Sequence, residues 1–263
     1  MINPIIKITE SIGKSIINFI TELGQIILLA FNIIKYFPRC FKDRNLVLEQ
    51  MAKVGSDSLP LVLLIGSFTG AIAALQATNI FDKFNLIELA TPFLGSSIAT
   101  VVFTELTPVL TALVIAGRVG GSMAAQLGTM NVTEQIDALE MMAIDKHRYL
   151  GMPRLLSALV MMPVLAVFSN AVALIGGFLL TYIKFDFSFY TFFDSVITYF
   201  SFYDVIIGLV KSCVFGGTTA LIGVNVGFNT VGGAEGVGNS TVRAFTLSAA
   251  VILILDAVFG YIF

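Results

Sequence analysis

Long apolar runs separated by short polar segments dominate the sequence after residue 58. Each run reaches the roughly 20 residues that an α-helix needs to cross the hydrocarbon core of a bilayer. The runs predict five transmembrane helices, at about 59–79, 96–127, 153–183, 205–226 and 242–262. The second and third runs exceed the length that a bilayer requires, so we expect these helices to tilt or to protrude. The pattern predicts an all-α integral membrane protein.

The first 58 residues follow a different pattern. From residue 4 to residue 27, apolar positions recur at helical spacing with charged and amide side chains between them, which indicates an amphipathic helix. Residues 26–37 are more apolar but too short to span a bilayer. We therefore expect residues 4–37 to form an interfacial (elbow) helix that ends at Pro38, followed by a basic loop. Residues 1–58 thus form one region, and residues 59–263 the transmembrane domain.

A polar insert separates the second and third spans. Asn131 with Glu134 three residues later has the spacing of a capping box, which predicts a helix over about 131–145. Carboxylates give this helix a negative face. Two interpretations stay open: a solvated helix that only connects two spans, and a helix that another protein grips. Elsewhere we expect an aromatic interfacial loop over 184–204 and a glycine-rich turn over 232–240.

Composition narrows the class. The chain has 263 residues, of which 57% are hydrophobic and 12% are charged, and its mean hydropathy is +0.92. Soluble domains carry about 25% charged residues, so a membrane protein is expected. The net charge of −2 gives no indication of a nucleic-acid partner. Two distant cysteines and a single histidine predict neither a disulfide nor a metal site.

Basic residues set the expected orientation. With five spans, the N-terminal region, the polar insert and the glycine-rich turn share one side of the membrane. That side carries Lys7, Lys14, Lys35, Arg39, Lys42, Arg44, Lys53, Lys146, Arg148, Arg154 and Arg243, and the other side carries Lys83 and Lys184. The positive-inside rule places the N-terminus and the insert in the cytoplasm, or in the equivalent stromal compartment, and the C-terminus on the far side.

Two stretches resemble a known family. ELTPVLTALVIAGRVGGSMAAQLGTM followed by NVTEQIDALEMMAIDKHRYLGMPRLLSALVMMPVL, and the later GGAEGVGNSTVRAFTLSAAVILILD, are similar to the MlaE/YrbE-type permeases. These are membrane subunits of lipid-transporting ABC systems associated with MCE-domain proteins. The similarity runs from about residue 50 to residue 263.

The resemblance implies a permease transmembrane domain that works as a homodimer, without enzymatic chemistry. It implies a lipid substrate, an MCE-domain lipid-binding protein, and a separate cytoplasmic ABC ATPase that holds ATP and Mg; this chain is expected to carry no cofactor. It also allows a small STAS-type regulatory subunit. A bacterial inner (plasma) membrane and a plastid inner envelope both fit. The insert becomes a coupling helix, and the expected ATPase contacts are Glu134, Gln135, Asp137, Ala138, Leu139 and Glu140. Consistent with a separate ATPase, the chain contains no G-x-x-x-x-G-K-[ST] sequence.

Ionisable residues inside the spans are the strongest candidates for a site. Glu105, Lys211 and Asp256 fall at similar depth in three different spans, so we expect them to form a cluster. Arg118 lies nearer the insert and could anchor a lipid phosphate or pair with a carboxylate such as Glu134. The cluster could serve helix assembly or could line and gate a substrate cavity, and both interpretations stay open.

A lipid cavity would need apolar walls beside this cluster, because burying acyl chains requires no directional partner. The wall residues expected from the first two spans are Leu75, Thr78, Phe103 and Leu106, with simple packing or lipid exposure as the alternative for each.

Two other functions remain. An ion-coupled secondary transporter would use the three clustered charges as a proton relay. A non-transporting membrane scaffold would anchor a peripheral complex and move nothing.

Overall fold

The computed structural model describes residues 13, 17, 21, 23–84 and 87–263, and gives the backbone alone for 87–90. Nearly half of the expected interfacial helix over 4–37 lies outside the described residues, which include an apolar helix over Leu23–Ile34. Pro38 lies in a short 3₁₀ turn, η1 (Phe37–Arg39), so the chain does leave the helix where proline predicts. A helix with exposed polar residues, α2 (Arg44–Val54), follows in the expected loop and buries Val47 and Val54 in the core.

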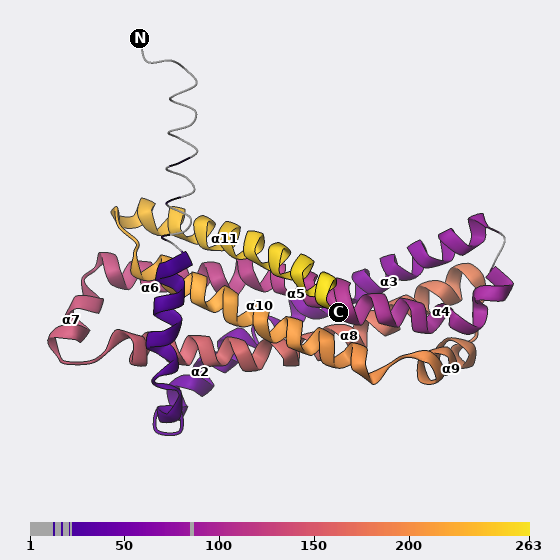
Figure 1. The fold of residues 1–263 in the computed structure, drawn as a ribbon, viewed down its shortest axis with the longest axis horizontal. Coiled ribbons are helices and arrows are strands. Elements are labelled where there is room, and N and C mark those ends of the chain that lie inside the picture. Colours follow the sequence, from indigo (N-terminus) through magenta and orange to yellow (C-terminus); the bar gives the residue numbers. More distant parts are fainter. Residues whose placement is uncertain (1–12, 14–16, 18–20, 22, 85–86) are drawn as a thin grey trace, which may run out of the picture.

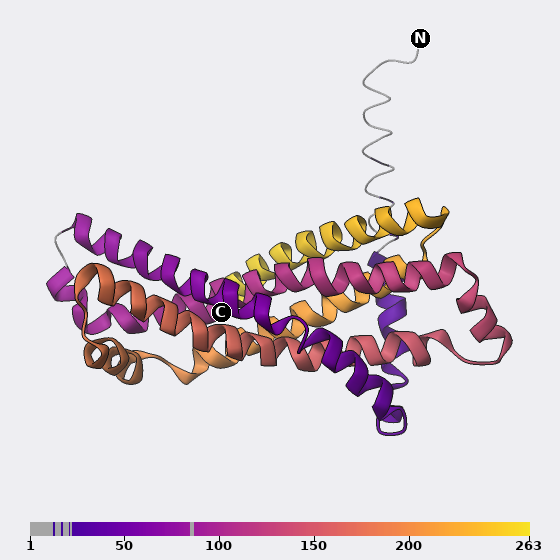
Figure 2. The same ribbon diagram turned by 180° about the vertical axis from the view of Figure 1, so that it is seen from behind.

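Five helical segments of the described chain are long and apolar enough to cross a bilayer, as the sequence predicts. They are α3 (Leu59–Lys83), Thr91–Val132, His147–Phe185, α10 (Phe202–Phe228) and α11 (Gly233–Ile262). Figures 1 and 2 show them as an elongated bundle in which α7 lies at one end and α4 and α9 lie toward the other. The described residues contain helices and turns but no strand, which confirms the all-α integral membrane fold.

The second span is interrupted by two π-helical turns. Its order is α4 (Ile87–Val101), η2 (Val102–Leu106), α5 (Thr107–Ile115), η3 (Ala116–Gly120) and α6 (Gly121–Val132). A π-turn inserts an extra residue into an α-helix and is frequent at functional sites. Each turn carries one of the ionisable residues of this span, Glu105 in η2 and Arg118 in η3.

A seam of small residues joins α3 to α8 (Met152–Phe185). A Cβ added at Gly66 would lie 2.7 Å from the Ser169 carbonyl oxygen, and one at Gly70 would collide with the Ala173 carbonyl. The opposite helix has the same feature, because a Cβ at Gly176 would collide with the Ser67 carbonyl. The two backbones therefore touch along the seam, as small residues allow in membrane helices.

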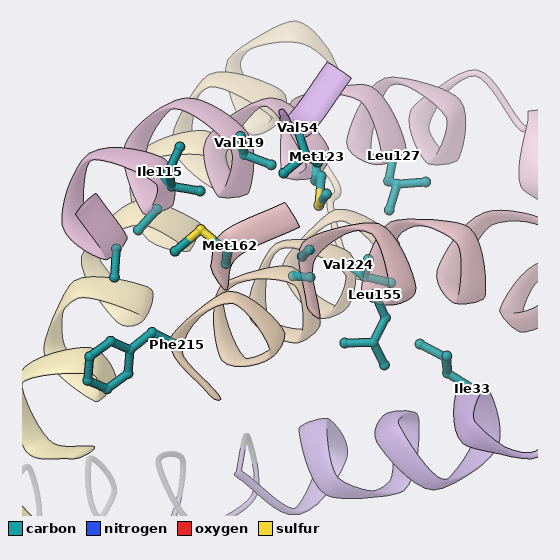
Figure 3. Close-up of a cluster of buried hydrophobic side chains, with 14 of the residues drawn as sticks. Ile33, Val54, Ile115, Val119, Met123, Leu127, Leu155, Met162, Phe215 and Val224 are labelled. Atoms are coloured by element: carbon teal, nitrogen blue, oxygen red, sulfur yellow. The ribbon is translucent and has the colours of Figure 1, made fainter. Parts of the chain in front are cut away.

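The main core lies between α5, α6, α8 and α10, where Ile115, Leu127, Met162 and Phe215 are fully buried (Figure 3). Ile33 reaches this core from the apolar N-terminal helix (Figure 3). The two last spans differ greatly, since 56% of the apolar window of α10 is buried but only 11% of that of α11. Most of α11 thus remains free to contact lipid or protein.

Three connecting segments depart from the sequence predictions. The expected aromatic loop contains a helix, α9 (Phe189–Tyr199), whose Phe192 packs into a second core cluster. The glycine-rich turn is short, because only Gly232 and Gly233 have positive φ and α11 begins at Gly233. In the insert, α6 continues to Val132, and α7 covers only Gln135–Met141.

Candidate functional site

Three spans meet at one buried lysine. The Lys211 Nζ donates to Glu105 Oε1 at 2.8 Å and to Asp256 Oδ1 at 3.0 Å, and the lysine side chain is 1% exposed. The structure therefore brings together the three charges whose depths predicted a cluster. We call these residues the Lys211 cluster. Two carboxylates offset the cost of one buried ammonium, and the group carries one excess negative charge when all three are ionised.

The Lys211 cluster is sealed on one side and open on the other. The side chains of Glu105 and Asp256 are 45% and 22% exposed, in contrast to the buried lysine that they contact. Glu105 sits in the η2 turn and Asp256 sits on the poorly buried α11. The carboxylates can thus reach a ligand or a neighbouring subunit without moving Lys211.

The four expected wall residues do not share one cavity. Leu75 lines a groove of about 540 Å³ between α3 and α8, and Leu106 lines another of about 480 Å³ between α3 and α4. Phe103 packs edge to face on Phe200, with 5.0 Å between the ring centroids. Thr78 is 1% exposed, and its hydroxyl donates to the Ala74 carbonyl, so it faces neighbouring helices. Their assignment to a lipid cavity stays a prediction.

The polar insert exposes its acidic face at the end of the bundle (Figure 1). Glu134, Gln135, Asp137, Ala138 and Glu140 are all exposed, and Leu139 is half-buried. Ile136 is 1% exposed and anchors α7 to the core. The predicted capping box is absent, because Asn131 belongs to α6 and its Nδ2 donates to the Thr230 carbonyl oxygen.

Two features of the insert are not predicted by the sequence pattern. Met141 and Met142 are 90% and 70% exposed at the end of α7, which is unusual for large apolar side chains in a polar segment. The residues that bracket the helix, Glu134 and Ala143, have left-handed φ values of 57° and 59°. Such backbone costs energy for residues with a Cβ, and it is found at positions held by the surrounding structure.

A polar network fixes the insert to the N-terminal region. The Tyr36 hydroxyl donates to Asp145 Oδ2 at 2.7 Å, and the His147 backbone N–H donates to Asp145 Oδ1 at 2.7 Å. The Arg148 guanidinium donates to both carboxylate oxygens of Asp43, at 2.9 and 3.0 Å. We call Tyr36, Asp43, Asp145 and Arg148 the α7-end network.

These contacts stabilise the ionised carboxylates of the network. The hydrogen bonds from Arg148 hold the pKa of Asp43 below its usual range. Partial burial alone would raise the pKa of Asp145, but the Tyr36 hydroxyl and the backbone N–H groups outweigh it and lower that pKa. Both groups are therefore charged at neutral pH.

Arg118 lies near a carboxylate, as one of the expected alternatives has it, but the carboxylate is that of Asp57. Its guanidinium donates to the Ser58 hydroxyl and lies 3.9 Å from Asp57 Oδ2, so it contacts the segment before α3 and not Glu134.

The described residues include no group of three or more histidine, cysteine, aspartate or glutamate side chains placed to bind a metal ion.

The fold and these sites define a class. Five apolar helices, a buried ion cluster within them and an exposed polar insert describe a polytopic integral membrane protein of the transporter type. A family model described as Permease MlaE matches residues 47–262, and the chain belongs to this family of permeases. Membership of this family indicates a transporter subunit.

Individual relatives agree with the family. The chain is 31% identical over 258 residues to the Haemophilus influenzae "Intermembrane phospholipid transport system permease protein MlaE", covering 96% of this chain and 95% of that protein. It is 37% identical over 254 residues to a Rickettsia felis "Probable ABC transporter permease protein", with 95% of each covered. The chloroplastic TRIGALACTOSYLDIACYLGLYCEROL 1 protein of Arabidopsis thaliana is 33% identical over 216 residues, 82% of this chain and 61% of that protein.

Proposed function

We propose that this chain is the permease subunit of an ABC transporter that moves phospholipid or a related lipid between the membrane and an MCE-domain protein. A separate cytoplasmic ATPase supplies the energy, and two copies of the chain form the translocation unit. The N-terminus and α7 face the cytoplasm or stroma, and the C-terminus faces the far side. One observation carries the proposal: α7 is anchored in the core by Ile136, whereas its acidic side chains are exposed.

The anchoring of α7 suits the transmission of force. Ile136 holds the helix in the core, and Asp145 and Arg148 tie the segment after it to the N-terminal region. An ATPase that grips the exposed carboxylates would therefore move α6, η4 (His147–Gly151) and α8 with α7, because these elements adjoin the insert on both sides. Met141 and Met142 would add apolar contact area to the same interface.

The Lys211 cluster would lie at the substrate cavity. Its two carboxylates are partly exposed, and Asp256 belongs to α11, most of whose surface is uncovered, so a second copy placed against α11 would close a space around them. Leu106, next to Glu105 in η2, would then contribute an apolar wall. The η2 turn would let this part of the helix change register as the cavity opens and closes.

Charge reversal on α7 tests the proposal. The double substitution Glu134→Lys with Asp137→Lys should lower the amount of copurified ATPase by about tenfold or more, because it places like charges against a surface that binds carboxylates. The matched control is Asp82→Lys with Asp194→Lys, which reverses two exposed carboxylates, one in the last turn of α3 and one in α9. Helix α9 lies toward the end of the bundle opposite α7 (Figure 1). Equal retention of the ATPase by both double variants would contradict the proposal.

Reconstitution separates the rival functions. Vesicles that contain the purified complex and labelled phospholipid should show ATP-dependent lipid transfer. Flux driven by a proton gradient without ATP would support an ion-coupled secondary transporter. A complex that assembles but moves no lipid under either condition would support a scaffold.

A further inference from the structure

A polar cavity of about 330 Å³ lies between the α2 region and the η3–α6 part of the second span, apart from the Lys211 cluster. Its polar lining side chains are Gln50, Lys53, Asp57, Arg118, Ser122 and Gln126. The volume is at the lower end of the range for small-ligand sites, and several polar groups converge on it.

The cavity lies at the depth of lipid headgroups. Arg118 marks its inner end, because it contacts Ser58 immediately before Leu59 begins the first span. Gln126 lies eight residues nearer α7 on the same helix, which is about 12 Å. The headgroup region adds about 5–7 Å to each side of the hydrocarbon core. A phospholipid in this leaflet can thus place its phosphate beside Arg118.

The position of the Arg118 guanidinium would allow it to bind an anion in the cavity. The η3 turn presents it, Ser58 fixes the guanidinium, and the Asp57 carboxylate remains 3.9 Å away, beyond the distance of a charge-assisted hydrogen bond. A buried cation lies behind the lining residue Gln126, outside the cavity itself. Arg154 is 6% exposed and donates to the Leu150 carbonyl and to Gln126, while its Nε lacks a partner within the described residues.

Two of the charged side chains that line the cavity remain available to a ligand. Lys53 is paired with Glu49 at 2.6 Å, which leaves Arg118 and Asp57 as an adjacent cation and anion. A zwitterionic headgroup has one group of opposite charge for each of these two side chains, whereas an anionic headgroup has none for Asp57. The exposed Asp57 is placed to accept from an ammonium group while Arg118 binds a phosphate.

We propose that this cavity binds the zwitterionic headgroup of an aminophospholipid from the leaflet on the α7 side, with Arg118 on the phosphate and Asp57 on the amine. The site is separate from the Lys211 cluster, and its binding does not require transport. It would hold a lipid at the point where the second span enters the membrane.

Lipid titration tests the proposal on the purified full-length protein after delipidation, with native mass spectrometry as the readout. Phosphatidylethanolamine should bind more tightly than phosphatidylglycerol with the same acyl chains. Arg118→Gln should weaken phosphatidylethanolamine binding about tenfold, because it removes a charged hydrogen-bond donor. Asp57→Asn should abolish the preference for the amine. Arg44→Gln, an exposed change on α2 outside the cavity, is the control and should have no effect.

Two further measurements keep the test decisive. Hydrogen exchange should show lipid-dependent protection in residues 50–58 and 118–126, and Glu105→Gln should leave this protection unchanged. Glycerophosphoethanolamine should displace the lipid, and equal displacement by inorganic phosphate would identify a site for free anions and overturn the proposal. The proposal also fails if Asp57→Asn, which alters an exposed side chain, leaves the lipid preference intact.

Discussion

Two sets of charged contacts hold this molecule together, and they differ in burial and in reach. The Lys211 cluster joins three spans around an ammonium that is 1% exposed. The α7-end network joins the N-terminal region to the segment after α7, and its members are exposed or half-buried. Both sets connect residues more than a hundred positions apart, Glu105 with Lys211 and Tyr36 with Asp145.

The difference in burial separates their roles. A buried ammonium without a partner is costly, so the Lys211 cluster couples the second, fourth and fifth spans to global stability. Exposed ion pairs contribute little to the free energy of unfolding, so the α7-end network can only set the local position of the insert. The charges of the Lys211 cluster are thus expected to affect global stability, and those of the α7-end network to affect the insert locally.

The largest expected effect comes from stranding Lys211. The double substitution Glu105→Gln with Asp256→Asn should lower the free energy of unfolding by about 3–5 kcal/mol, because it leaves a buried charge unpaired. Adding Lys211→Met should restore most of that loss, since it removes the stranded charge. Thermal unfolding of the detergent-solubilised protein measures both changes, and a triple variant as unstable as the double one would contradict this account.

The same triple variant decides whether the cluster serves transport. If the charges act only in assembly, the triple variant should recover lipid transfer together with its stability. If they line the cavity, the triple variant should be stable but inactive in reconstituted vesicles.

The two carboxylates of the cluster should differ when changed singly. Asp256→Asn should destabilise the protein more than Glu105→Gln, because the Asp256 side chain is 22% exposed and that of Glu105 is 45% exposed. We expect about 1–2 kcal/mol for Asp256→Asn, within the range for a lost charged hydrogen bond. Thermal unfolding of the two single variants side by side checks the order, and the reverse order would show that exposure does not govern these contacts.

Breaking the α7-end network should have a local effect. Asp145→Asn weakens the acceptor for the Tyr36 hydroxyl and for the backbone N–H of His147, so protease cleavage within residues 133–146 should become several-fold faster. The global unfolding temperature should change far less than in the double cluster variant. Asp137→Asn, an exposed change on α7 itself, is the matched control for charge.

Acid should weaken the α7-end network only at low pH. Asp43 and Asp145 have lowered pKa values in the folded protein, so their contribution is fully present above the usual carboxyl pKa and is lost as pH falls through the lower folded values. Hydrogen exchange of the insert, corrected for intrinsic rates, should stay flat from pH 8 to about 5 and rise only below about pH 4. A rise near pH 6 would point to another titrating group.

Much of the fold follows from the sequence for a simple reason. Crossing hydrocarbon requires about 20 apolar residues with internally satisfied backbone groups, so each span is visible in the apolar runs. Boundaries in the polar segments are less visible. Asn131 has the residue type of a cap but continues α6, because its side chain binds the Thr230 carbonyl from a distant part of the chain.

The candidate site shows the same division. Depth along a helix depends only on residue count, so Glu105, Lys211 and Asp256 could be placed at one level. The face of the second span on which a residue lies could not be predicted beyond η2 and η3, because each π-turn rotates the residues that follow it. The assignment of the four wall residues to a lipid cavity stays a prediction, and Leu75 and Leu106 line separate grooves of the single chain.

The seam between α3 and α8 limits how this protein can move. A larger side chain at Gly66, Gly70 or Gly176 would collide with the facing backbone, so α3 and α8 are packed closely enough that we expect them to move together as one unit. The second span has a π-turn on each side of α5, and we expect changes of shape to be concentrated there.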